Sequence, residues 1–456
     1  MVVKYIKEVF EDKSFLRKIV SIAIPIAFQN LLNTTLNLID TMMIGSLGQS
    51  AIAAVGLANK VFFVFSLLLF GIVSGSSILT AQYYGKKDIK SIKKVLGMSL
   101  ILGLVGSLIF IVAGIFIPES VMRIFTTSEN TIMTGARYLR IVALSYPLTA
   151  VTICYISVLR STNRVKAPVF ISIISILVNV ALNYTFIYGN FGFSAMGVSG
   201  AAIATVIARL VECSLILVIA YKVKGPAAAK IKELIDFNKE FVKKFFVTVS
   251  PVIANEFMWG LGVTMYALVY GRMGDGAVAS ITITQNVEQI CVVLFQGLSA
   301  STAVILGNEL GANKLKKAER HARGIFVIQM IMTIIMIIIC ILIRKPLINL
   351  FSVGEEVAKD ITKCLNVFIC YLPFRMFNLI NIVGVLRSGG DTKAALILDI
   401  TGVWLVGIPM AVLGGIIFKL PIYYVYGMIT FEELYKFVFG FRRYKKKLWV
   451  KNIVGD

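Results

Sequence analysis

"IPIAFQNLLNTTLNLIDTMMIGSLG" (residues 24–48) is a mostly apolar stretch, long enough to cross a lipid bilayer as one helix. It carries a single acidic residue, Asp40. An aspartate at the centre of a membrane helix is unfavourable by roughly 2.5 to 3.5 kcal/mol, so an acid in such a place is a candidate functional residue. The stretch therefore predicts a membrane helix and a functional carboxylate together.

The composition of the whole chain agrees with a membrane protein. Of its 456 residues, 58% are hydrophobic and 15% are charged, and the mean hydropathy is +0.85. A soluble domain has roughly 45–50% apolar and 25% charged residues. The basic residues that give the chain its net charge of +22 lie between the apolar runs, as in the loops of membrane proteins. We therefore expect no nucleic-acid partner.

Apolar runs of at least about 18 residues predict an all-α polytopic membrane protein with twelve transmembrane helices. The last run is interrupted by charged residues and is the weakest of the twelve. The expected spans are 19–44, 52–82, 95–117, 138–159, 168–189, 196–221, 245–270, 277–307, 324–343, 361–386, 394–417 and 420–441.

The basic residues predict how these spans are oriented. Most of the 46 lysines and arginines lie in the N-terminal segment, the even-numbered loops and the C-terminal segment. Cytoplasmic loops are the ones enriched in Lys and Arg, so we expect a multi-pass protein of the plasma (inner) membrane with both termini in the cytoplasm. The odd-numbered loops hold only Arg123, Arg137, Arg272, Arg344, Lys345, Lys359 and Lys419.

An internal repeat divides the chain into two halves. At an offset of 226 residues Pro25 falls on Pro251 and Gly71 on Gly297, and one inserted residue later "VLRS" (158–161) falls on "VLRS" (385–388). Two sets of six helices enter the membrane with the same orientation, so the repeat is parallel, a plan known in transporters. We predict an N-lobe of residues 1–222, a cytoplasmic linker of residues 223–243 and a C-lobe of residues 244–456.

Acidic residues inside the predicted spans are the first candidates for function. Either they act in transport or they form ion pairs with nearby bases. For Glu212 the ion pair is favoured, because Arg209 precedes it by three residues on one helix face. No basic residue lies within two turns of Asp40 in the sequence, and for the other acids both interpretations stay open. The five acids are Asp40, Glu212, Glu256, Glu288 and Asp399.

Polar residues of the fifth and sixth spans could complete a site around Asp40. Asn179 and Asn183 are four residues apart and share one helix face, and Thr205 lies in the next span. These side chains either bind an ion or hydrogen-bond neighbouring helices together. A Na⁺ ion would use the oxygens of Asp40, Asn179 and Asn183, whereas a proton needs only the carboxylate. Pro25 removes a backbone hydrogen bond in the first span and permits a bend.

With these residues in view, the chain resembles the MATE family, the multidrug and toxic compound extrusion antiporters. The resemblance covers nearly the whole chain, and its motifs occur in order and in duplicate. They are the stretch 24–48, "AQYYGKKDIKSIKK" (81–94) with "GNELGANKLKKAERHA" (307–322), "VLRSTNRVKAP" (158–168) with "VLRSGGDTKAA" (385–395), and "NVALNYTFIYG" (179–189).

The resemblance implies a two-lobed exporter of cationic or amphiphilic organic compounds that takes up H⁺ or Na⁺ in exchange and needs no cofactor. In members with an aspartate in the first helix, the N-lobe cation site corresponds here to Asp40, Asn179, Asn183 and Thr205, with Pro25 as the helix bend. Many relatives have an aspartate where Asn183 stands, so one formal charge is missing and H⁺ is favoured over Na⁺. The substrate cavity would include Glu256, Glu288, Trp259 and Tyr266.

Other classes of protein fit the sequence less well. A lipid-linked-oligosaccharide flippase has a similar two-lobed architecture but usually lines its cavity with cations, whereas the spans here contain five acids. An intramembrane enzyme would need a catalytic pair, and a channel would need a repeated selectivity ring. Neither is evident, and the single histidine, His321, cannot supply a histidine-based metal centre. We expect a monomeric transporter, in contact with membrane lipid, that is not an enzyme.

Overall fold

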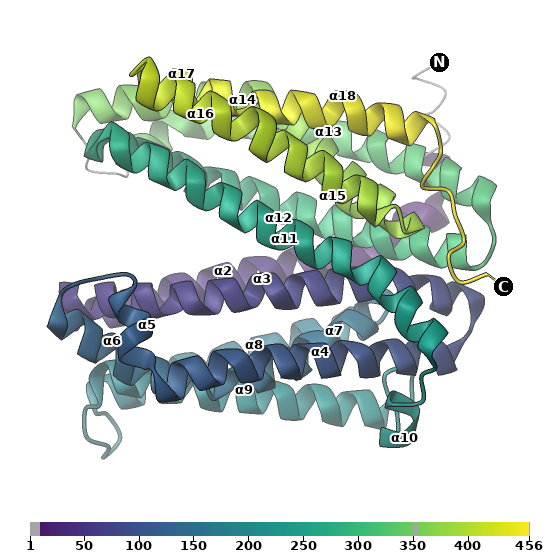
Figure 1. Ribbon diagram of the computed structural model, residues 1–456, viewed down its shortest axis with the longest axis horizontal. Coiled ribbons are helices and arrows are strands. Elements are labelled where there is room, and N and C mark those ends of the chain that lie inside the picture. Colours follow the sequence, from purple (N-terminus) through teal and green to yellow (C-terminus); the bar gives the residue numbers. More distant parts are fainter. Residues whose placement is uncertain (1–9, 350–353, 456) are drawn as a thin grey trace. The chain divides into compact units, whose positions relative to one another are not determined.

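The computed structural model describes residues 10–349 and 354–455, and all regular elements in these two ranges are helices (Figure 1). Long apolar runs in a membrane can satisfy their backbone hydrogen bonds only within helices or closed barrels. The all-helical architecture expected from the apolar periodicity is therefore confirmed.

The helices group into two compact units, one of Phe28–Ile253 and the other of Met1–Ala27 with Ala254–Asp456. The two division points lie two residues after Pro25 and two residues after Pro251, and they are separated by the offset of the repeat. Each half thus gives the start of its first helix to the other half's unit. The lobe boundaries predicted from the sequence follow the repeat, whereas this grouping follows packing.

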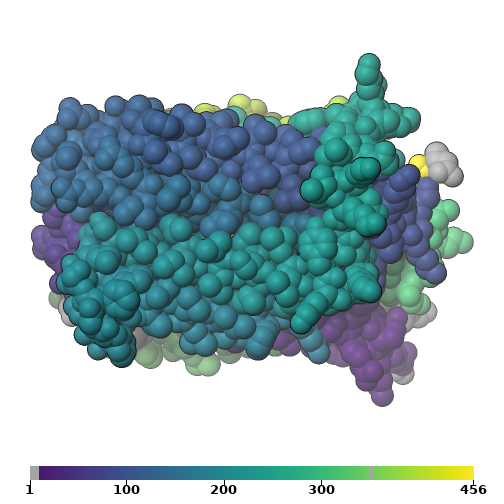
Figure 2. All heavy atoms as spheres, turned by 90° about the horizontal axis from the view of Figure 1, so that it is seen from below, coloured from purple at the N-terminus to yellow at the C-terminus, as the bar shows by residue number. Residues whose placement is uncertain are grey.

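The unit of Phe28–Ile253 is built from the helices of the first half. Within it α3 packs on α4, α4 on α7, and α8 on α9. In the space-filling view of Figure 2, atoms of this unit, in blue and teal, cover much of the visible face. The helices are α2 (Lys13–Gly45), α3 (Gln49–Lys86), α4 (Ile89–Phe116), α5 (Pro118–Arg123), α6 (Glu129–Val142), α7 (Ser145–Ser161), α8 (Lys166–Tyr188), α9 (Gly197–Lys222) and α10 (Ile231–Leu234).

The core of this unit is apolar and fully packed. Phe65, Tyr146 and Ala202 are completely buried in it, and the rings of Phe65 and Tyr146 stack with their centroids 5.0 Å apart. The predicted linker segment also belongs to this unit, because α10 packs on α4 and Lys93 donates to Glu233 at 2.7 Å.

The second unit contains the helices of the other half, and several of its spans change their helical pitch. In the described residues π-helical segments occur only in this half, and such segments are frequent at functional sites. The elements are α11 (Lys239–Met273), α12 (Asp275–Gly311), α13 (Leu315–Asn349), α14 (Glu355–Asn378), η1 (Leu379–Leu386), η2 (Arg387–Gly389), α15 (Thr392–Ile400), η3 (Thr401–Gly407), α16 (Ile408–Val412), η4 (Leu413–Ile417), α17 (Ile422–Ile429) and α18 (Phe431–Lys445).

The observed helices accommodate the twelve predicted spans. Among the described residues ten helical segments are long and apolar enough to cross a membrane, and α6 with α7 forms an eleventh span bent by 49°. The twelfth predicted span, 420–441, forms α17 and α18 with Thr430 between them. The charged residues at the start of α18 explain why this span had the weakest sequence signal.

Small residues let the start of each first helix approach its neighbour closely. A methyl group added at Gly71 of α3 would lie 2.7 Å from the Cα of Ile253 on α11. At the equivalent place in the repeat, a methyl group on Gly297 of α12 would lie 2.6 Å from the backbone oxygen of Ala23 on α2. Both glycines therefore permit helix packing that any larger residue would prevent.

We predict that Gly71→Ala destabilises the protein by about 1–3 kcal/mol, because the added methyl group collides with backbone that cannot move aside. Gly56→Ala on the same helix is the matched control, since nothing lies within 4 Å of a methyl group there. The measurement is the thermal unfolding of the purified protein in detergent. Equal melting temperatures for the two variants would show that Gly71 is not a packing contact.

Candidate functional site

Asp40 and the two asparagines predicted to surround it lie together in the structure. Asp40 is on α2, and Asn179 and Asn183 are on α8. The Asn183 Nδ2 group donates to Asp40 Oδ1 at 2.7 Å and to Asn179 Oδ1 at 3.0 Å. Both asparagines are buried, and among the described residues Asn183 Oδ1 has no hydrogen-bond partner. One amide group therefore links the carboxylate to the second amide.

Thr205 lies on α9, and its hydroxyl donates to the backbone oxygen of Ala201 at 3.0 Å. The buried side chain of Tyr138, on α6, interacts with both Thr205 and Asp40. The sequence analysis did not identify Tyr138. Helical spacing relates residues of one helix only, so it cannot show that a tyrosine of the fourth span reaches an acid of the first.

Arg209 also lies near Asp40, which the sequence analysis did not predict. Its guanidinium interacts electrostatically with Asp40 from α9 and donates to Glu212 Oε2 at 2.7 Å. The ion pair between Arg209 and Glu212 is the one predicted from their spacing, and it is confirmed. The same arginine thus serves a structural carboxylate and lies within electrostatic reach of the candidate functional one.

Further polar contacts connect this pair to the rest of the unit. Ser172 of α8 donates to Glu212 at 3.3 Å and accepts from Gln29 of α2 at 2.7 Å. The Gln29 amide oxygen in turn accepts from Arg160 of α7 at 2.6 Å. These hydrogen bonds form a network that runs from the Arg160 guanidinium to the Glu212 carboxylate. The network joins α2 to α7, α8 and α9.

Pro25 lies within α2, which is a single α-helix from Lys13 to Gly45. Proline cannot donate a backbone hydrogen bond, so the helix is weakened at this point. The role of Pro25 as a bend remains a prediction.

The acid Glu256 is not the water-facing residue that we expected. On α11 its side chain is only 10% exposed, and Oε1 accepts from Arg387 at 3.0 Å. Arg387 occupies the repeat position of Arg160, which binds the Gln29 amide oxygen in the first half. A buried carboxylate that is paired with arginine has a structural partner already, and the place of Glu256 in the substrate cavity stays a prediction.

Glu288 is also buried in an ion pair, and its place in a cavity wall stays a prediction. It lies on α12 and is 5% exposed. Its Oε1 atom accepts from the Tyr371 hydroxyl at 2.7 Å, and Oε2 accepts from Arg375 at 2.8 Å. The guanidinium balances the carboxylate, and both partners come from α14.

The two aromatic candidates occupy different environments in the second unit. Trp259 of α11 is 42% exposed. Tyr266, at the repeat position of Asp40, donates a hydrogen bond to Glu432 of α18. Lys436 lies between Glu432 and Asp399, at 3.8 and 3.4 Å, and therefore neutralises part of their charge.

Sequence comparisons show that the repeat and the family resemblance are real. The MatE family model matches residues 25–185 and again residues 251–413. The two matches begin 226 residues apart, which confirms the repeat offset. Relatives match over most of the chain, although at low identity.

The relatives include both named and uncharacterised transporters. YisQ, an uncharacterized transporter of Bacillus subtilis, is 23% identical over 441 residues, which are 96% of this chain and 96% of YisQ. The probable multidrug resistance protein NorM of Thermotoga maritima is 24% identical, over 87% of this chain and 84% of NorM. The multidrug resistance protein PmpM of Pseudomonas aeruginosa is 24% identical, over 87% and 83%.

Solved structures have the same fold. A crystal structure of MATE in the bent conformation gives a TM-score of 0.87 at 19% identity and covers 98% of this chain and 97% of its own. An outward-facing multidrug resistance MATE family transporter of the MOP superfamily gives 0.85 at 20% identity, with 96% of each chain covered. Since the family model matches both halves and most of the sequence, this chain belongs to the MatE family of membrane transporters.

Proposed function

We propose that this protein is an H⁺-coupled antiporter that exports cationic or amphiphilic organic compounds across the cell membrane by alternating access. The apolar helices support a membrane location. Membership in a transporter family supports a role that is not enzymatic. The relatives named as multidrug resistance proteins support small organic compounds as substrates and favour export over the flippase alternative. Both termini lie in the cytoplasm in this proposal, and the protein acts as a monomer.

The hydrogen bond between Asn183 and Asp40 is the observation that carries the proposal. An amide side chain offers a donor and an acceptor. The ionised carboxylate accepts from Nδ2, as in this structure, and a protonated carboxyl would donate to Oδ1 after the amide turns over. The buried Oδ1 atom has no partner in the described residues and is available for that bond. Asn183 therefore suits either protonation state of Asp40.

The surroundings of Asp40 favour a proton over Na⁺. A hard cation needs several oxygen ligands that point into one site. Here the oxygens of Asp40 and Asn179 both accept from the Asn183 amide nitrogen, and Arg209 adds a positive charge nearby. A proton needs only the carboxylate.

Coupling requires that the two protonation states prefer different conformations of one element. Our candidate is α2, because it carries Asp40 and is weakened at Pro25. Loss of the Asp40 charge removes the electrostatic attraction to Arg209 and reverses the hydrogen bond with Asn183. The helix can then settle into a second conformation, in which substrate affinity differs.

We predict that Asp40→Asn protein folds and reaches the membrane but exports substrate at a rate near background, because its side chain can no longer exchange a proton. Ethidium efflux from proteoliposomes is measured under an imposed pH gradient and, separately, an imposed Na⁺ gradient. Glu129→Gln, which changes an exposed acid paired with Arg123, is the control and should keep wild-type activity. Wild-type rates in the Asp40→Asn vesicles would exclude Asp40 as the coupling residue.

A second prediction concerns the coupling ion. Asn183→Asp restores a second carboxylate beside Asp40, which should attract Na⁺ and make efflux respond to an imposed Na⁺ gradient. The wild-type protein should respond to the pH gradient alone. A wild-type protein driven by Na⁺ at constant pH would contradict H⁺ coupling, whatever the variant does.

A third prediction tests the structural role of Glu256. In Glu256→Gln the ion pair with the buried Arg387 is lost, and breaking a buried pair costs about 3–5 kcal/mol. The amount of folded protein should fall, while ethidium and a neutral amphiphile should be exported with equal relative loss. Adding Arg387→Met should recover part of the stability. A selective loss of ethidium export would instead place Glu256 at the substrate.

A further inference from the structure

A groove with a volume of about 850 Å³ runs along the unit of Met1–Ala27 and Ala254–Asp456. Its walls are formed by α13, α14 and α18, and the start of α2 closes one end. Most of the lining is apolar and aromatic, with Phe326 and Phe377 stacked at 4.7 Å and Phe437 4.9 Å from Phe377. Such a lining suits a hydrocarbon chain.

The groove opens beside exposed apolar side chains of α13. Met330 and Ile334 of α13 line it and are 59% and 55% exposed. Helix α13 is among those long and apolar enough to span the membrane, and exposed apolar side chains on such a helix suit contact with acyl chains. A lipid can therefore enter the groove sideways from the bilayer.

The length of the groove fits one acyl chain of a lipid. From Arg320 to Ile337 the lining follows α13 for about 25 Å, at about 1.5 Å per residue. The hydrocarbon core of a bilayer is about 30 Å thick, so one leaflet contributes about half of that. The groove is long enough for one acyl chain and the headgroup attached to it.

The closed end of the groove carries charges of both signs. Glu11 and Asp12 line it together with Arg320 and Arg323. Arg320 donates to Asp12 at 3.3 Å, yet its side chain remains 59% exposed and offers further donors on the guanidinium. The backbone N–H of Phe15 and the Ser14 hydroxyl donate to Asp12 and lower the pKa of its carboxyl, which keeps it ionised.

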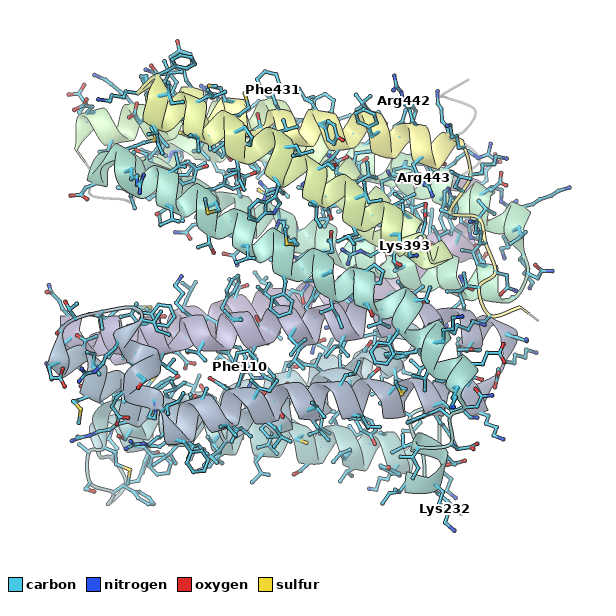
Figure 3. The ribbon with its side chains drawn as sticks, viewed as in Figure 1. Phe110, Lys232, Lys393, Phe431, Arg442 and Arg443 are labelled. Carbon is cyan, nitrogen blue, oxygen red and sulfur yellow. The ribbon has the colours of Figure 1, made fainter. Side chains whose placement is uncertain are left out.

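Several basic residues of this unit lie at the same end. Helix α18 leads from Phe431 to Arg442 and Arg443, and Lys393 lies near them (Figure 3). Tyr444, next in the sequence, lines the groove. The acids Glu11 and Asp12 are set into this basic region, so a purely anionic headgroup would meet carboxylates as well as guanidiniums.

We propose that the groove is a binding site for a zwitterionic phospholipid with a primary ammonium headgroup. The acyl chain lies against the phenylalanines of α13, α14 and α18. The phosphate binds Arg320 and Arg323, and the ammonium binds Asp12 and Glu11. The mixed charge of the groove end selects this lipid over an anionic one, which lacks the ammonium, and over a trimethylated one, which cannot donate hydrogen bonds to carboxylates.

The test is native mass spectrometry of the full-length protein in detergent with phosphatidylethanolamine, phosphatidylglycerol and phosphatidylcholine of identical acyl chains. One molecule of phosphatidylethanolamine should be retained. Each partly exposed ion pair contributes up to about 1 kcal/mol, so the preference over the other two lipids should be about fivefold. Asp12→Asn should abolish the preference over phosphatidylglycerol, because asparagine keeps the helix cap but not the charge.

Two neighbouring positions give a matched pair for the acyl-chain site. Ile334→Trp fills the groove and should prevent retention of the lipid, whereas Ile335→Trp, equally exposed but outside the lining, should not. Equal retention by both variants would mean that the lipid is only annular and would overturn the proposal. So would equal or tighter binding of phosphatidylglycerol by the wild type. If Ile334→Trp does not fold, the Asp12→Asn measurement decides.

Discussion

A charge buried among apolar helices needs a partner, because its hydration is lost and the low dielectric makes an unpaired charge very unfavourable. The spans of this protein follow that constraint. Glu212, Glu256 and Glu288 each bind an arginine at 2.7 to 3.0 Å. Asp40 is arranged differently, because its hydrogen bond comes from a neutral amide while the guanidinium of Arg209 acts on it from a greater separation than it acts on Glu212. This difference is why we propose Asp40, and not the other three acids, as the residue that exchanges a proton.

The repeat shows how one scaffold holds both kinds of acid. Arg160 and Arg387 occupy equivalent positions, yet the first binds the amide oxygen of Gln29 and the second the carboxylate of Glu256. At the position of Asp40 the second half has Tyr266, and the nearby carboxylate comes from Glu432 of α18. Lys436 and Arg375 then balance the acids of the second half. The two arginines hold neighbouring helices together in both halves. The residue that each arginine binds is an amide in the first half and a carboxylate in the second.

The membrane class, the helices, the repeat and the pair of Arg209 with Glu212 could be predicted from the sequence, because each depends on periodicity or on spacing within one helix. The cluster of Asp40 with Asn179 and Asn183 was suggested by the helix face that the two asparagines share, and the family resemblance implied it as well. Partners between distant helices were not predictable: Arg387 is 131 residues from Glu256, and Tyr138 lies on a different helix from Asp40. The π-helical segments η1, η3 and η4 also had no sequence signal, since their residues have ordinary helical composition.

The first helix, α2, belongs to both units. Residues up to Ala27 pack with the unit of the second half, and residues from Phe28 pack with the unit of the first. Pro25 lies two residues before this division, where a missing backbone hydrogen bond makes bending least costly. Asp40 is fifteen residues further along the same helix, about 22 Å at the usual rise. In the mechanism that we propose, protonation at Asp40 bends the helix at this weak point, which lies beside the boundary between the two units.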